Sequence, residues 1–411
     1  MSIQRKVFLS TILILTLLAL FYVQYDFAQK EPGGDDSVPR WLGAQAWLYK
    51  GISPYSDIVS QQSQTVISGR LAQGNQDKQL FVYPFYVIIF YLPVIWLPFN
   101  VARAIWMVLL ELCTAGIVFF SAKTYNWSPP PWLLGVSIVL TVFMYNSVRT
   151  IILWQMAGVV AFLITFALWA LKSNRDVLAG ISLALATVKP QMVFLILPLL
   201  VIMWSIRKRT RFVLSVVISL ALLAGFSFLA QPTWLADMLA QMKVYPSYSV
   251  IPALLYIFTG FFPASIKTVL QWALLAVFII WLLWEWTPVL LHHREADYAI
   301  VLTLLITNII VIRSATTNYL MMVPGFFFIF AIMEKTDKKK SYFYVLLLQL
   351  FYFIGIWVLF ASTVYQGFET WPNYFPMPLL LLGGLIWARH NPYLISELNA
   401  KDEQGISSSG L

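Results

Sequence analysis

Residues Gly33 to Ser56 read GGDDSVPRWLGAQAWLYKGISPYS, the first long polar stretch of this chain. The stretch follows a first apolar run and precedes a series of further apolar runs. Ser37 and Pro39 are helix-start signals, and Gly51 is a helix-stop signal. The sequence therefore predicts a short helix over Val38–Lys50, within a loop that connects membrane-spanning segments.

This predicted helix is amphipathic, so we expect it to lie along the membrane surface. Arg40 and Lys50 are expected to reach water. The apolar side is expected to hold Val38, Trp41, Leu42, Leu48 and Tyr49.

Asp36 stands at the start of the predicted helix, next to Asp35, and two roles fit it. In the first, Asp36 or Ser37 caps the helix by accepting backbone N–H bonds worth about 1 kcal/mol. In the second, a carboxylate at the boundary of lipid and water acts as a general base toward a membrane-bound substrate. Asparagine replaces a cap but not a base, so Asp36→Asn separates the two roles.

The composition is that of a membrane protein with many spans. Of its 411 residues, 60% are hydrophobic and 11% are charged, which lies outside the usual range of soluble globular proteins. The net charge of +9 arises largely from short basic runs between apolar segments, such as residues 207–211 and 335–340. This is the positive-inside pattern, so the charge does not indicate a nucleic-acid partner. The single cysteine, Cys113, excludes a disulfide framework.

Thirteen apolar segments are candidate membrane spans. They are Val7–Tyr25, Phe81–Leu97, Ala102–Ala122, Trp132–Tyr145, Ile151–Leu171, Val177–Val188, Gln191–Ile206, Phe212–Leu229, Ile266–Trp286, Tyr298–Val311, Tyr319–Ile332, Phe343–Phe360 and Pro376–Trp387. If all of them crossed, the basic run 207–211 would lie outside, against the charge rule. We expect Trp132–Tyr145, which follows three prolines, to be re-entrant. The prediction is an all-α polytopic membrane protein with about 12 transmembrane helices, both termini inside, and surface helices in the outer loops.

The expected organisation is a single transmembrane domain over residues 1–390. Its first segment reads as an uncleaved signal anchor. Residues 26–80 form the first outer loop, with a second helical piece over Ile58–Arg70. Residues 230–265 form the second large outer loop and residues 361–373 a third, and residues 391–411 form a polar cytoplasmic tail.

Lys189 and Arg313 are candidate anion ligands. We expect Lys189 and Pro190 to form the apex of a hairpin of two short apolar segments. The alternative is one kinked span from Gly180 to Trp204, which buries Lys189 at mid-depth. Lys189 could bind a phosphate entering from the bilayer, or it could snorkel or pair with Glu111. Arg313 could bind phosphate on the outer face or anchor a helix end.

The sequence shows no phosphate-binding glycine loop, zinc-ligand spacing or serine–histidine–acid arrangement. His292 and His293 are expected to be solvated in a cytoplasmic loop. No cofactor is required, and the sequence does not exclude a divalent metal. Some aromatic side chains in the outer loops could stack on sugar faces, among them Trp41, Tyr55, Tyr83 and Trp234.

Four stretches in this order resemble family 87 of the glycosyltransferases. That family comprises membrane enzymes of the C-type fold, including polyprenyl-phosphate-mannose-dependent mannosyltransferases. The stretches are DDSVPRWLGAQAWLYKGISPYS, FVYPFYVIIFYLPVIWLPFNVARAIWMVL, WQMAG and DVLAGISLALATVKPQMVFLILPLL. The resemblance covers the first half of the chain closely and the second half loosely.

The resemblance implies roles for residues of the first half. Asp36 corresponds to the proposed base of such enzymes, with Asp35 as the second choice. Gln155 resembles the glutamine of a glycine–glutamine element, in which Trp154 stands in place of the glycine. Lys189 matches a lysine of the family.

The later residues and the outer loops complete the implied site. Asn318 occupies a region in which relatives often carry histidine, so a histidine-assisted mechanism does not follow. The implied donor-phosphate ligands are Lys189 and Arg313. The implied substrate-binding residues are Arg40, Tyr55, Tyr83, Gln155 and Asn318.

The implied reaction moves a hexose, mannose in the family, from a polyprenyl-phosphate donor to a glycolipid or another membrane acceptor. It takes place on the extracytoplasmic face of the plasma membrane, with inversion at the anomeric carbon. The donor already carries a good leaving group, so neither a nucleotide site nor an obligatory metal is required. A transporter or lipid flippase is the alternative, and it predicts repeated halves or broken helices near the midplane. A non-catalytic assembly protein is a third class.

Overall fold

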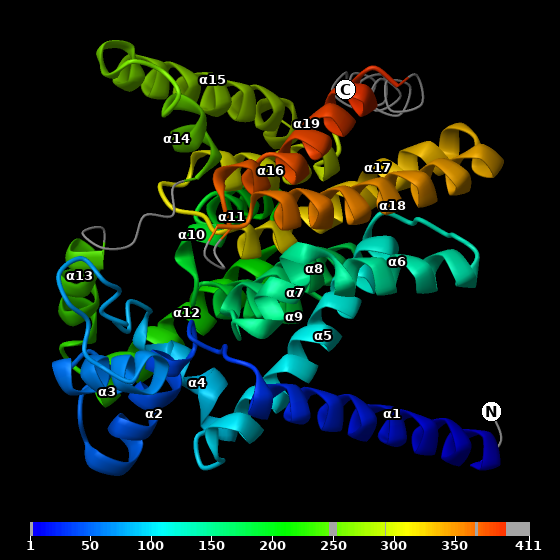
Figure 1. The fold of residues 1–411 in the computed structure, drawn as a ribbon. Helices are drawn as coiled ribbons and strands as arrows, with labels where there is room; N and C mark the ends of the chain where they lie inside the picture. Colours follow the sequence, from blue (N-terminus) through cyan, green and yellow to red (C-terminus); the bar gives the residue numbers. More distant parts are fainter. Residues whose placement is uncertain (1–2, 246–252, 292, 366–368, 392–411) are drawn as a thin grey trace. The chain divides into compact units, whose positions relative to one another are not determined.

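The computed structural model describes residues 3–245, 253–291, 293–365 and 369–391. In this part of the chain 79% of the structure is helix and there are no strands, as Figure 1 shows. The all-α prediction is therefore confirmed. The predicted tail from residue 392 onward and the predicted environment of His292 lie outside the described residues.

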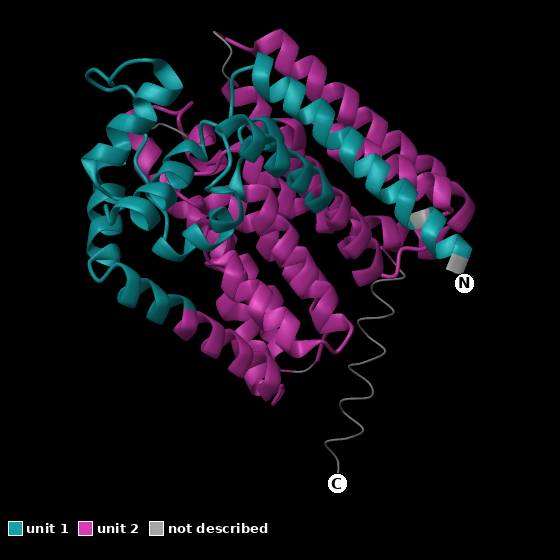
Figure 2. Ribbon diagram, turned by 90° about the horizontal axis from the view of Figure 1, so that it is seen from below, with its two compact units in different colours: residues 1–113, 149–156, 223–249 teal, residues 114–148, 157–222, 250–411 magenta. Residues whose placement is uncertain are grey.

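The chain divides into two compact units, which Figure 2 colours separately. Unit 1 comprises residues 1–113, 149–156 and 223–249. Unit 2 comprises residues 114–148, 157–222 and 250–411. The long helices α5 (Phe99–Thr124) and α12 (Thr210–Ala230) each contribute residues to both units.

Unit 1 contains the N-terminal helix and the helices of the first outer loop. Its further elements are α1 (Ile3–Lys30), α2 (Val38–Lys50), α3 (Asp57–Ser68), η1 (Phe85–Val87), α4 (Ile88–Tyr91), η2 (Leu92–Val94) and α13 (Trp234–Val244). Helix α2 has the predicted bounds and ends at Gly51, whose φ of 62° is left-handed. The predicted span Phe81–Leu97 instead forms three short helical pieces, and Pro93 lies within the last of them.

The predicted faces of α2 are partly wrong. Arg40 is buried, with 8% of its surface exposed, whereas Leu48 and Tyr49 are 49% and 58% exposed. Arg40 is drawn inward because its guanidinium stacks on the ring of Tyr83, 4.3 Å from the centroid. The exposed Leu48 and Tyr49 leave an apolar strip at the C-terminal end of α2, which suits a helix at the membrane surface.

Unit 2 is organised around α16, whose residues from Tyr298 to Ile310 are all buried. Helices α15, α17 and α19 pack against it. The elements of unit 2 are α6 (Pro131–Phe143), the start of α7 (Tyr145–Ile152), α8 (Met156–Lys172), α9 (Asp176–Ala186), α10 (Pro190–Val193), α11 (Ile196–Ile206), α14 (Leu254–Thr259), α15 (Ala264–Leu290), α16 (Asp297–Ile310), η4 (Thr316–Met322), α17 (Val323–Thr336), α18 (Lys338–Thr363), η5 (Trp371–Tyr374) and α19 (Pro376–Arg389). A helix that is apolar all round belongs in a core, which is where α16 lies.

Six helices of the described chain are long and apolar enough to cross a membrane. They are Gln4–Lys30, Phe99–Thr124, Thr210–Ala230, Ala264–Leu290, Thr316–Thr336 and Lys338–Thr363. Helices α6 and α7, which meet at a bend of 54°, make a seventh span if the two are counted together as one span. The bend falls at the end of the segment predicted to be re-entrant. With at least six candidate spans, the chain is a polytopic membrane protein. Five further apolar helices are shorter than a full span, so the number of about 12 spans stays a prediction.

Helices α9 and α11 run in opposite directions. Arg209, just after α11, forms an ion pair of 2.5 Å with Asp176 at the start of α9. Arg209 also donates a hydrogen bond of 2.8 Å to the carbonyl of Leu171. The chain therefore turns back in the break that contains Lys189 and Pro190. The predicted hairpin is confirmed, and the alternative of one kinked span is wrong.

The same edge of unit 2 holds the ends of other helices. Lys172, the last residue of α8, pairs with Asp297, the first of α16, at 2.8 Å. Arg207 donates to the carbonyl of Val289 near the end of α15, at 3.0 Å. The basic residues of several connections thus share one edge, as the positive-inside rule requires. Arg313 follows the opposite end of α16.

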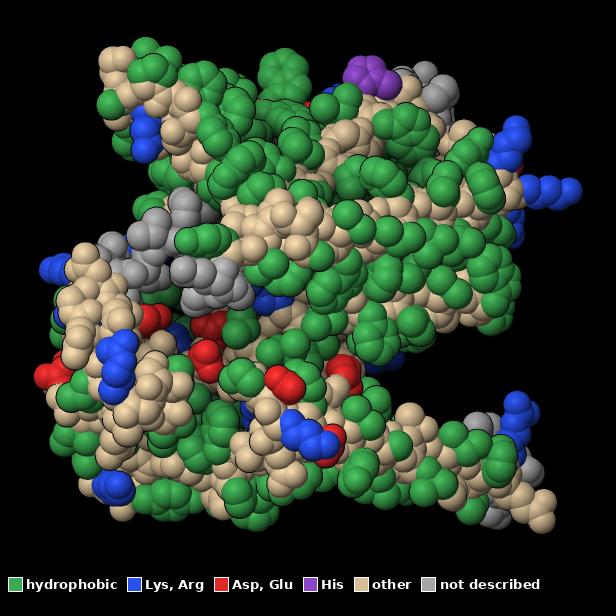
Figure 3. Space-filling model, in the orientation of Figure 1, with side chains coloured by type: hydrophobic (Ala, Val, Ile, Leu, Met, Phe, Trp, Pro, Cys, Tyr) green, Lys and Arg blue, Asp and Glu red, His purple; other side chains and the backbone are tan. Residues whose placement is uncertain are grey.

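A second basic group lies at the end where α17 and α18 meet. Figure 3 shows lysine and arginine side chains gathered there, whereas the lengths of these helices carry mainly hydrophobic side chains. This distribution is the one expected of helices whose flanks lie in hydrocarbon and whose ends reach water.

The close approach of α9 and α12 in unit 2 can be tested at Gly180. A Cβ at this position would lie 2.6 Å from Ser215 Cβ and 2.9 Å from the backbone nitrogen of Val216. We expect Gly180→Ala to destabilise the protein by about 1–3 kcal/mol through overpacking, measured by thermal unfolding in detergent. Gly135→Ala in α6 is the matched control, because no atom lies within 4 Å of its Cβ. Equal unfolding temperatures for the two variants would contradict the packing.

Candidate active site

A turn at Gly33 and Gly34 fixes the two acids that follow it. Arg103 of α5 donates hydrogen bonds to the carbonyls of Glu31 at 2.7 Å and Pro32 at 3.0 Å. The backbone N–H of Gly34 donates to the carbonyl of Ile152 at 3.0 Å. A side chain on Gly33 would come within 2.7 Å of that carbonyl, and its φ of 141° favours glycine. Residue 33 therefore has to be glycine.

Ser37, the residue before α2, makes no side-chain cap. Its hydroxyl instead donates to the carbonyl of Trp154 and lies 2.6 Å from the hydroxyl of Tyr91. Asp36 does not cap the helix either, because its side chain accepts from Gln155. The capping role predicted for Asp36 or Ser37 is therefore wrong.

Trp154 has an unusual backbone conformation for a large residue. Its φ is 53°, in the left-handed region, and its side chain is fully buried. Its indole packs on Tyr91, Phe99 and Trp106, with ring centroids 5.8–5.9 Å apart. The family that this sequence resembles carries glycine in place of Trp154. A left-handed φ at this position is the physical reason that glycine suits it.

Gln155 connects Asp36 to Tyr83. Its amide Nε2 donates to Oδ2 of Asp36 at 2.8 Å, and its Oε1 accepts from the hydroxyl of Tyr83 at 3.3 Å. Gln155 is buried, with 8% of its surface exposed, whereas Asp36 is half-buried. Oδ1 of Asp36 accepts no hydrogen bond in the described part of the chain. One oxygen of this carboxylate is therefore held and the other is open.

Arg40 lies beside this carboxylate without pairing with it. Its Nη1 donates to the backbone carbonyl of Asp36, and its guanidinium faces the ring of Tyr83. Its Nε is buried and has no hydrogen-bond partner. A buried N–H of a cation without an acceptor costs free energy, so it favours an acceptor supplied by a substrate.

Tyr55 joins the same group through the backbone. Its hydroxyl donates to the carbonyl of Tyr83 at 2.7 Å, and burial raises the pKa of this phenol. Gln241 of α13 donates to the carbonyl of Tyr55 at 2.8 Å and accepts from the N–H of Val82 at 3.1 Å. Helix α13 thereby holds the two loops that carry the tyrosines.

Asp35 is half-buried next to Asp36. Burial raises the pKa of the Asp35 carboxyl above its usual value, and the charge of Asp36 raises it further, while Arg103 opposes both effects. Among the described residues, no three His, Cys, Asp or Glu side chains form a group that could hold a metal ion.

Five of the predicted site residues thus lie together in unit 1, namely Asp36, Arg40, Tyr55, Tyr83 and Gln155. The other predicted residues, Lys189, Arg313 and Asn318, belong to unit 2. Lys189 is 4% exposed and precedes α10. Asn318 donates to the hydroxyl of Ser314 at 3.3 Å, and its Oδ1 is buried without a partner.

The predicted pairing of Lys189 with Glu111 is wrong. Glu111 accepts from the amide of Gln24 in α1 on one oxygen, and its other oxygen is buried without a partner. Gln24 is a polar residue within an apolar run, and such residues often bond across helices in membranes.

Several residues that hold the site are not marked as functional by the sequence. Arg103 carries a signal that could have found it, since an arginine inside an apolar run is expensive unless it has a function. Tyr91 and Gln241 carry no such signal, because their partners come from distant parts of the chain, and Ser37 was predicted only as a helix start or cap. The sequence marks Trp154 only by its departure from the family motif.

The fold described above is that of an all-α membrane protein with a loop-borne carboxylate. The model of glycosyltransferase family 87 matches residues 81–314, which is more than half of the chain. The chain belongs to this family, and it is a membrane glycosyltransferase.

Not all site residues lie in the matched region. Tyr83, Gln155, Lys189 and Arg313 fall within residues 81–314, whereas Asp36 precedes it. No curated protein matches the chain. No solved structure matches it either.

The left-handed backbone of Trp154 gives a stability prediction. Trp154→Ala and Trp154→Gly both lose the buried indole, at a cost of about 3–5 kcal/mol. Only glycine also relieves the left-handed penalty of roughly 1–2 kcal/mol. We therefore expect the Gly variant to be more stable than the Ala variant in chemical or thermal unfolding. At Ala161, inside α8, the order should reverse, with Gly less stable than Ala by roughly 1 kcal/mol. The same order at both positions would contradict the assigned conformation.

The raised pKa of Asp35 gives a pH dependence of stability. Its stabilising contribution is fully present below the unfolded pKa of about 3.9 and is lost as the pH rises through the higher folded pKa. Asp35→Asn keeps a neutral side chain, so it should unfold at a higher temperature than wild type near neutral pH. The difference should vanish below about pH 4.

Asp337 provides a control of opposite sign. A hydrogen bond from the Lys340 backbone N–H is the main cause that lowers the pKa of Asp337. Its contribution is present above the unfolded pKa and is lost as the pH falls through the folded pKa. Asp337→Asn should therefore lower the unfolding temperature near neutral pH. An Asp35→Asn variant that is less stable than wild type at neutral pH would overturn the assignment.

Proposed function

We propose that this glycosyltransferase moves a hexose, mannose in the first instance, from a polyprenyl-phosphate donor to a glycolipid or another membrane acceptor. The reaction takes place on the extracytoplasmic face of the plasma membrane. Asp36 is the general base, and the configuration at the anomeric carbon is inverted.

The observation that carries this proposal is the state of the Asp36 carboxylate. Oδ2 is held by Gln155 at 2.8 Å, while Oδ1 accepts no hydrogen bond in the described part of the chain. Oδ1 can therefore accept the proton of an acceptor hydroxyl. As the acceptor oxygen bonds to the anomeric carbon, the bond from that carbon to the donor phosphate breaks, and the phosphate leaves with the electron pair.

The neighbours of Asp36 in unit 1 suit a sugar. Arg40 offers an unpartnered buried N–H to an oxygen of the substrate. Gln155 and Tyr83 are linked by a hydrogen bond of 3.3 Å, and the backbone of Tyr83 is held by Tyr55. We assign substrate binding to these residues, because amides, phenols and aromatic rings are the groups that orient sugars.

In unit 2 we assign the donor phosphate to Lys189 and Arg313, since cations stabilise the charge that develops on a departing phosphate. Asn318 is assigned to substrate binding, because the buried Oδ1 lacks a partner and can accept from a hydroxyl.

The membrane arrangement follows from charge. Arg5 and Lys6 lie at the start of α1, and the acids Asp35 and Asp36 follow its other end. A helix of 28 residues is about 42 Å long at 1.5 Å per residue, enough to cross a bilayer. With the basic end inside, Asp36 faces the extracytoplasmic side. We retain the C-type fold and about 12 spans, counting the shorter apolar helices as spans.

A transporter or flippase without glycosyl transfer was the alternative, and membership of a glycosyltransferase family favours the enzyme over it. The same membership favours the enzyme over a non-catalytic assembly protein.

Sugar transfer in proteoliposomes tests the proposal. The purified chain receives radiolabelled polyprenyl-phosphate-mannose and extracted membrane acceptors, at equal folded yield for each variant. We expect Asp36→Asn to lower transfer by about 10²-fold to 10⁴-fold, the usual loss when a general base is removed.

Asp57→Asn is the matched control, because Asp57 is an exposed acid of the same loop at the start of α3. It should transfer at the wild-type rate. Equal transfer by wild type and Asp36→Asn would remove Asp36 as the base, and loss in Asp35→Asn alone would give that role to Asp35. No transfer by wild type with any donor and acceptor would count against the proposed reaction.

A further inference from the structure

Three N–H donors at one edge of unit 2 lack an acceptor. They are Nε of Arg207, Nη1 of Arg294 and the indole Nε1 of Trp204, and each is buried without a hydrogen-bond partner in the described part of the chain. Trp204 and Arg207 lie at the end of α11, and Arg294 lies between α15 and α16. A buried donor without an acceptor costs free energy, so these groups point to an acceptor supplied from outside the chain.

Contacts within unit 2 bring the three side chains to one place. Nη2 of Arg207 donates to the carbonyl of Val289 at 3.0 Å and to the carbonyl of Arg294 at 3.4 Å. The guanidinium of Arg207 also lies 5.6 Å from the ring centroid of Trp204. The ends of α11 and α15 therefore meet where the unsatisfied donors lie.

The buried acid at this edge, Glu285 of α15, does not satisfy these donors. Its Oε1 lies 3.2 Å from Nη2 of Arg389, and its Oε2 lies 3.6 Å from Nη1 of Arg294. The second distance is an ion pair but is too long for a hydrogen bond. Arg207 pairs with no carboxylate among the described residues. One carboxylate thus faces two arginines, and the third arginine has none.

The unsatisfied groups select the chemistry of a ligand. All three are donors, and two of them belong to guanidinium cations. A ligand that satisfies them needs several acceptor oxygens and a negative charge. Guanidinium groups bind phosphate oxygens in this way, through charge-assisted hydrogen bonds. The ligand class is therefore a phosphate anion.

The surroundings indicate that this phosphate belongs to a lipid. Ile206, next to Arg207, is 46% exposed, and Leu291, the residue after α15, is 59% exposed. Helix α15 is a candidate membrane span, so its end lies at the level of the phosphate groups of the bilayer. A free phosphate would leave the apolar neighbours uncovered, whereas a phospholipid covers them with its acyl chains.

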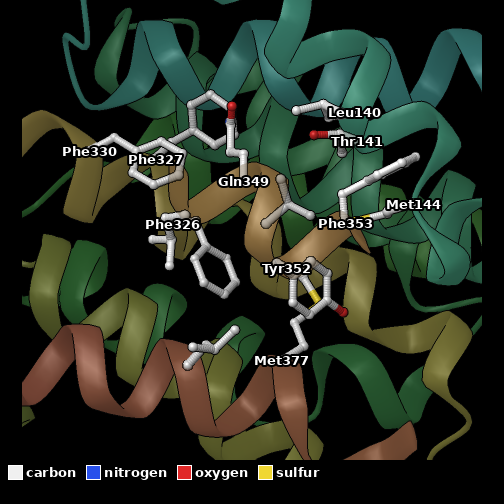
Figure 4. Close-up of a pocket in the computed structure, with 13 residues that line it drawn as sticks. Leu140, Thr141, Met144, Phe326, Phe327, Phe330, Gln349, Tyr352, Phe353 and Met377 are labelled. Carbon is white, nitrogen blue, oxygen red and sulfur yellow. The ribbon is translucent and has the colours of Figure 1, made fainter. Parts of the chain in front are cut away.

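The space between α6, α17, α18 and α19 makes no such demand. Figure 4 shows Gln349 and Tyr352 there among mainly apolar side chains. Gln349 and Ser137 exchange hydrogen bonds at 3.0 and 3.1 Å, and the hydroxyl of Tyr352 donates to Asn146 at 2.7 Å. This amide and this phenol have partners within unit 2, in contrast to the donors at the ends of α11 and α15.

We propose that Arg207, Arg294 and Trp204 bind the phosphate of an anionic phospholipid, at the edge that we assign to the cytoplasm. Basic groups between membrane helices on that side are suited to anionic lipid head groups. Phosphatidylcholine carries the same phosphate together with an ammonium group. Both oxygens of Glu285 already face arginines, so that carboxylate is not open to the ammonium. The site goes beyond the proposed sugar transfer and does not depend on it.

Competition between two lipids tests the site in the wild-type chain. The full chain in a neutral detergent receives equal amounts of phosphatidylglycerol and phosphatidylcholine with the same acyl chains, and native mass spectrometry counts the lipids that stay bound. We expect phosphatidylglycerol to be preferred by about tenfold. Phosphatidylglycerol should also raise the unfolding temperature, whereas inorganic phosphate at the same concentration should not.

Three variants separate the site from general attraction of the basic edge. Arg294→Gln should weaken phosphatidylglycerol binding by about tenfold. Arg211→Gln is the matched control, because Arg211 is an exposed arginine of the neighbouring connection, and it should bind as wild type does. Trp204→Phe keeps an aromatic ring and the net charge but loses the indole N–H, so it should also weaken binding. Thermal unfolding without added lipid confirms that each variant is folded.

Several results would overturn the inference. Equal binding of the two lipids would remove the preference for an anionic head group. Equal losses in Arg294→Gln and Arg211→Gln would mean that only the general charge of this edge attracts the lipid. An equal rise of the unfolding temperature with inorganic phosphate would assign the site to a free anion. The lipid competition needs no variant, so it decides even if a variant does not fold, and it does not involve sugar transfer.

Discussion

The candidate site depends on the left-handed backbone of Trp154. That conformation places Gln155 on Asp36, while the carbonyls of Trp154 and Ile152 accept from Ser37 and Gly34. The short turn at residues 152–155 therefore holds Gly34 and Ser37, the residues on either side of Asp35 and Asp36. The left-handed conformation costs roughly 1–2 kcal/mol, and three aromatic contacts worth about 0.5–1.5 kcal/mol each, together with burial of the indole, more than offset it. The strain is held by the packing around it.

In unit 2 the same demand for satisfied polar groups shapes the helix ends. Arg209 lies between α11 and α12, pairs with Asp176 at the start of α9 and donates to the carbonyl of Leu171 in α8, so it connects four helices. Basic residues at this edge thus reach water and also tie helices together. Lys189 and Arg313 stand at the other ends of α9 and α16. In a membrane, an edge rich in cations is expected on the cytoplasmic side, and the proposed donor-phosphate ligands Lys189 and Arg313 belong to the other ends of these helices.

The sequence predicted the helical class, the bounds of α2 and the hairpin at Lys189, because hydropathy and charge act locally and leave a periodic record. It did not predict that Arg40 is buried or that Leu48 is exposed. The side that a helix buries depends on which partners cover it, and the partner of Arg40 is Tyr83, more than forty residues away. The link from Gln241 to Tyr55 is invisible for the same reason. Contacts between distant segments decide how the side chains of a site are oriented.

The partners around Asp36 suit the role of general base that we propose for it. A cation bonded directly to the carboxylate would orient it and would also hold its negative charge against proton uptake. A neutral amide orients the group with a much weaker effect on the charge. Gln155 takes that position, and Arg40, although adjacent, donates to the backbone carbonyl of Asp36 instead. The guanidinium is thereby held beside the carboxylate by Tyr83 and by a neutral acceptor, with its buried Nε still to be satisfied. An oxygen of an incoming sugar or phosphate would supply that acceptor, so substrate binding would engage the arginine that lies next to the proposed base.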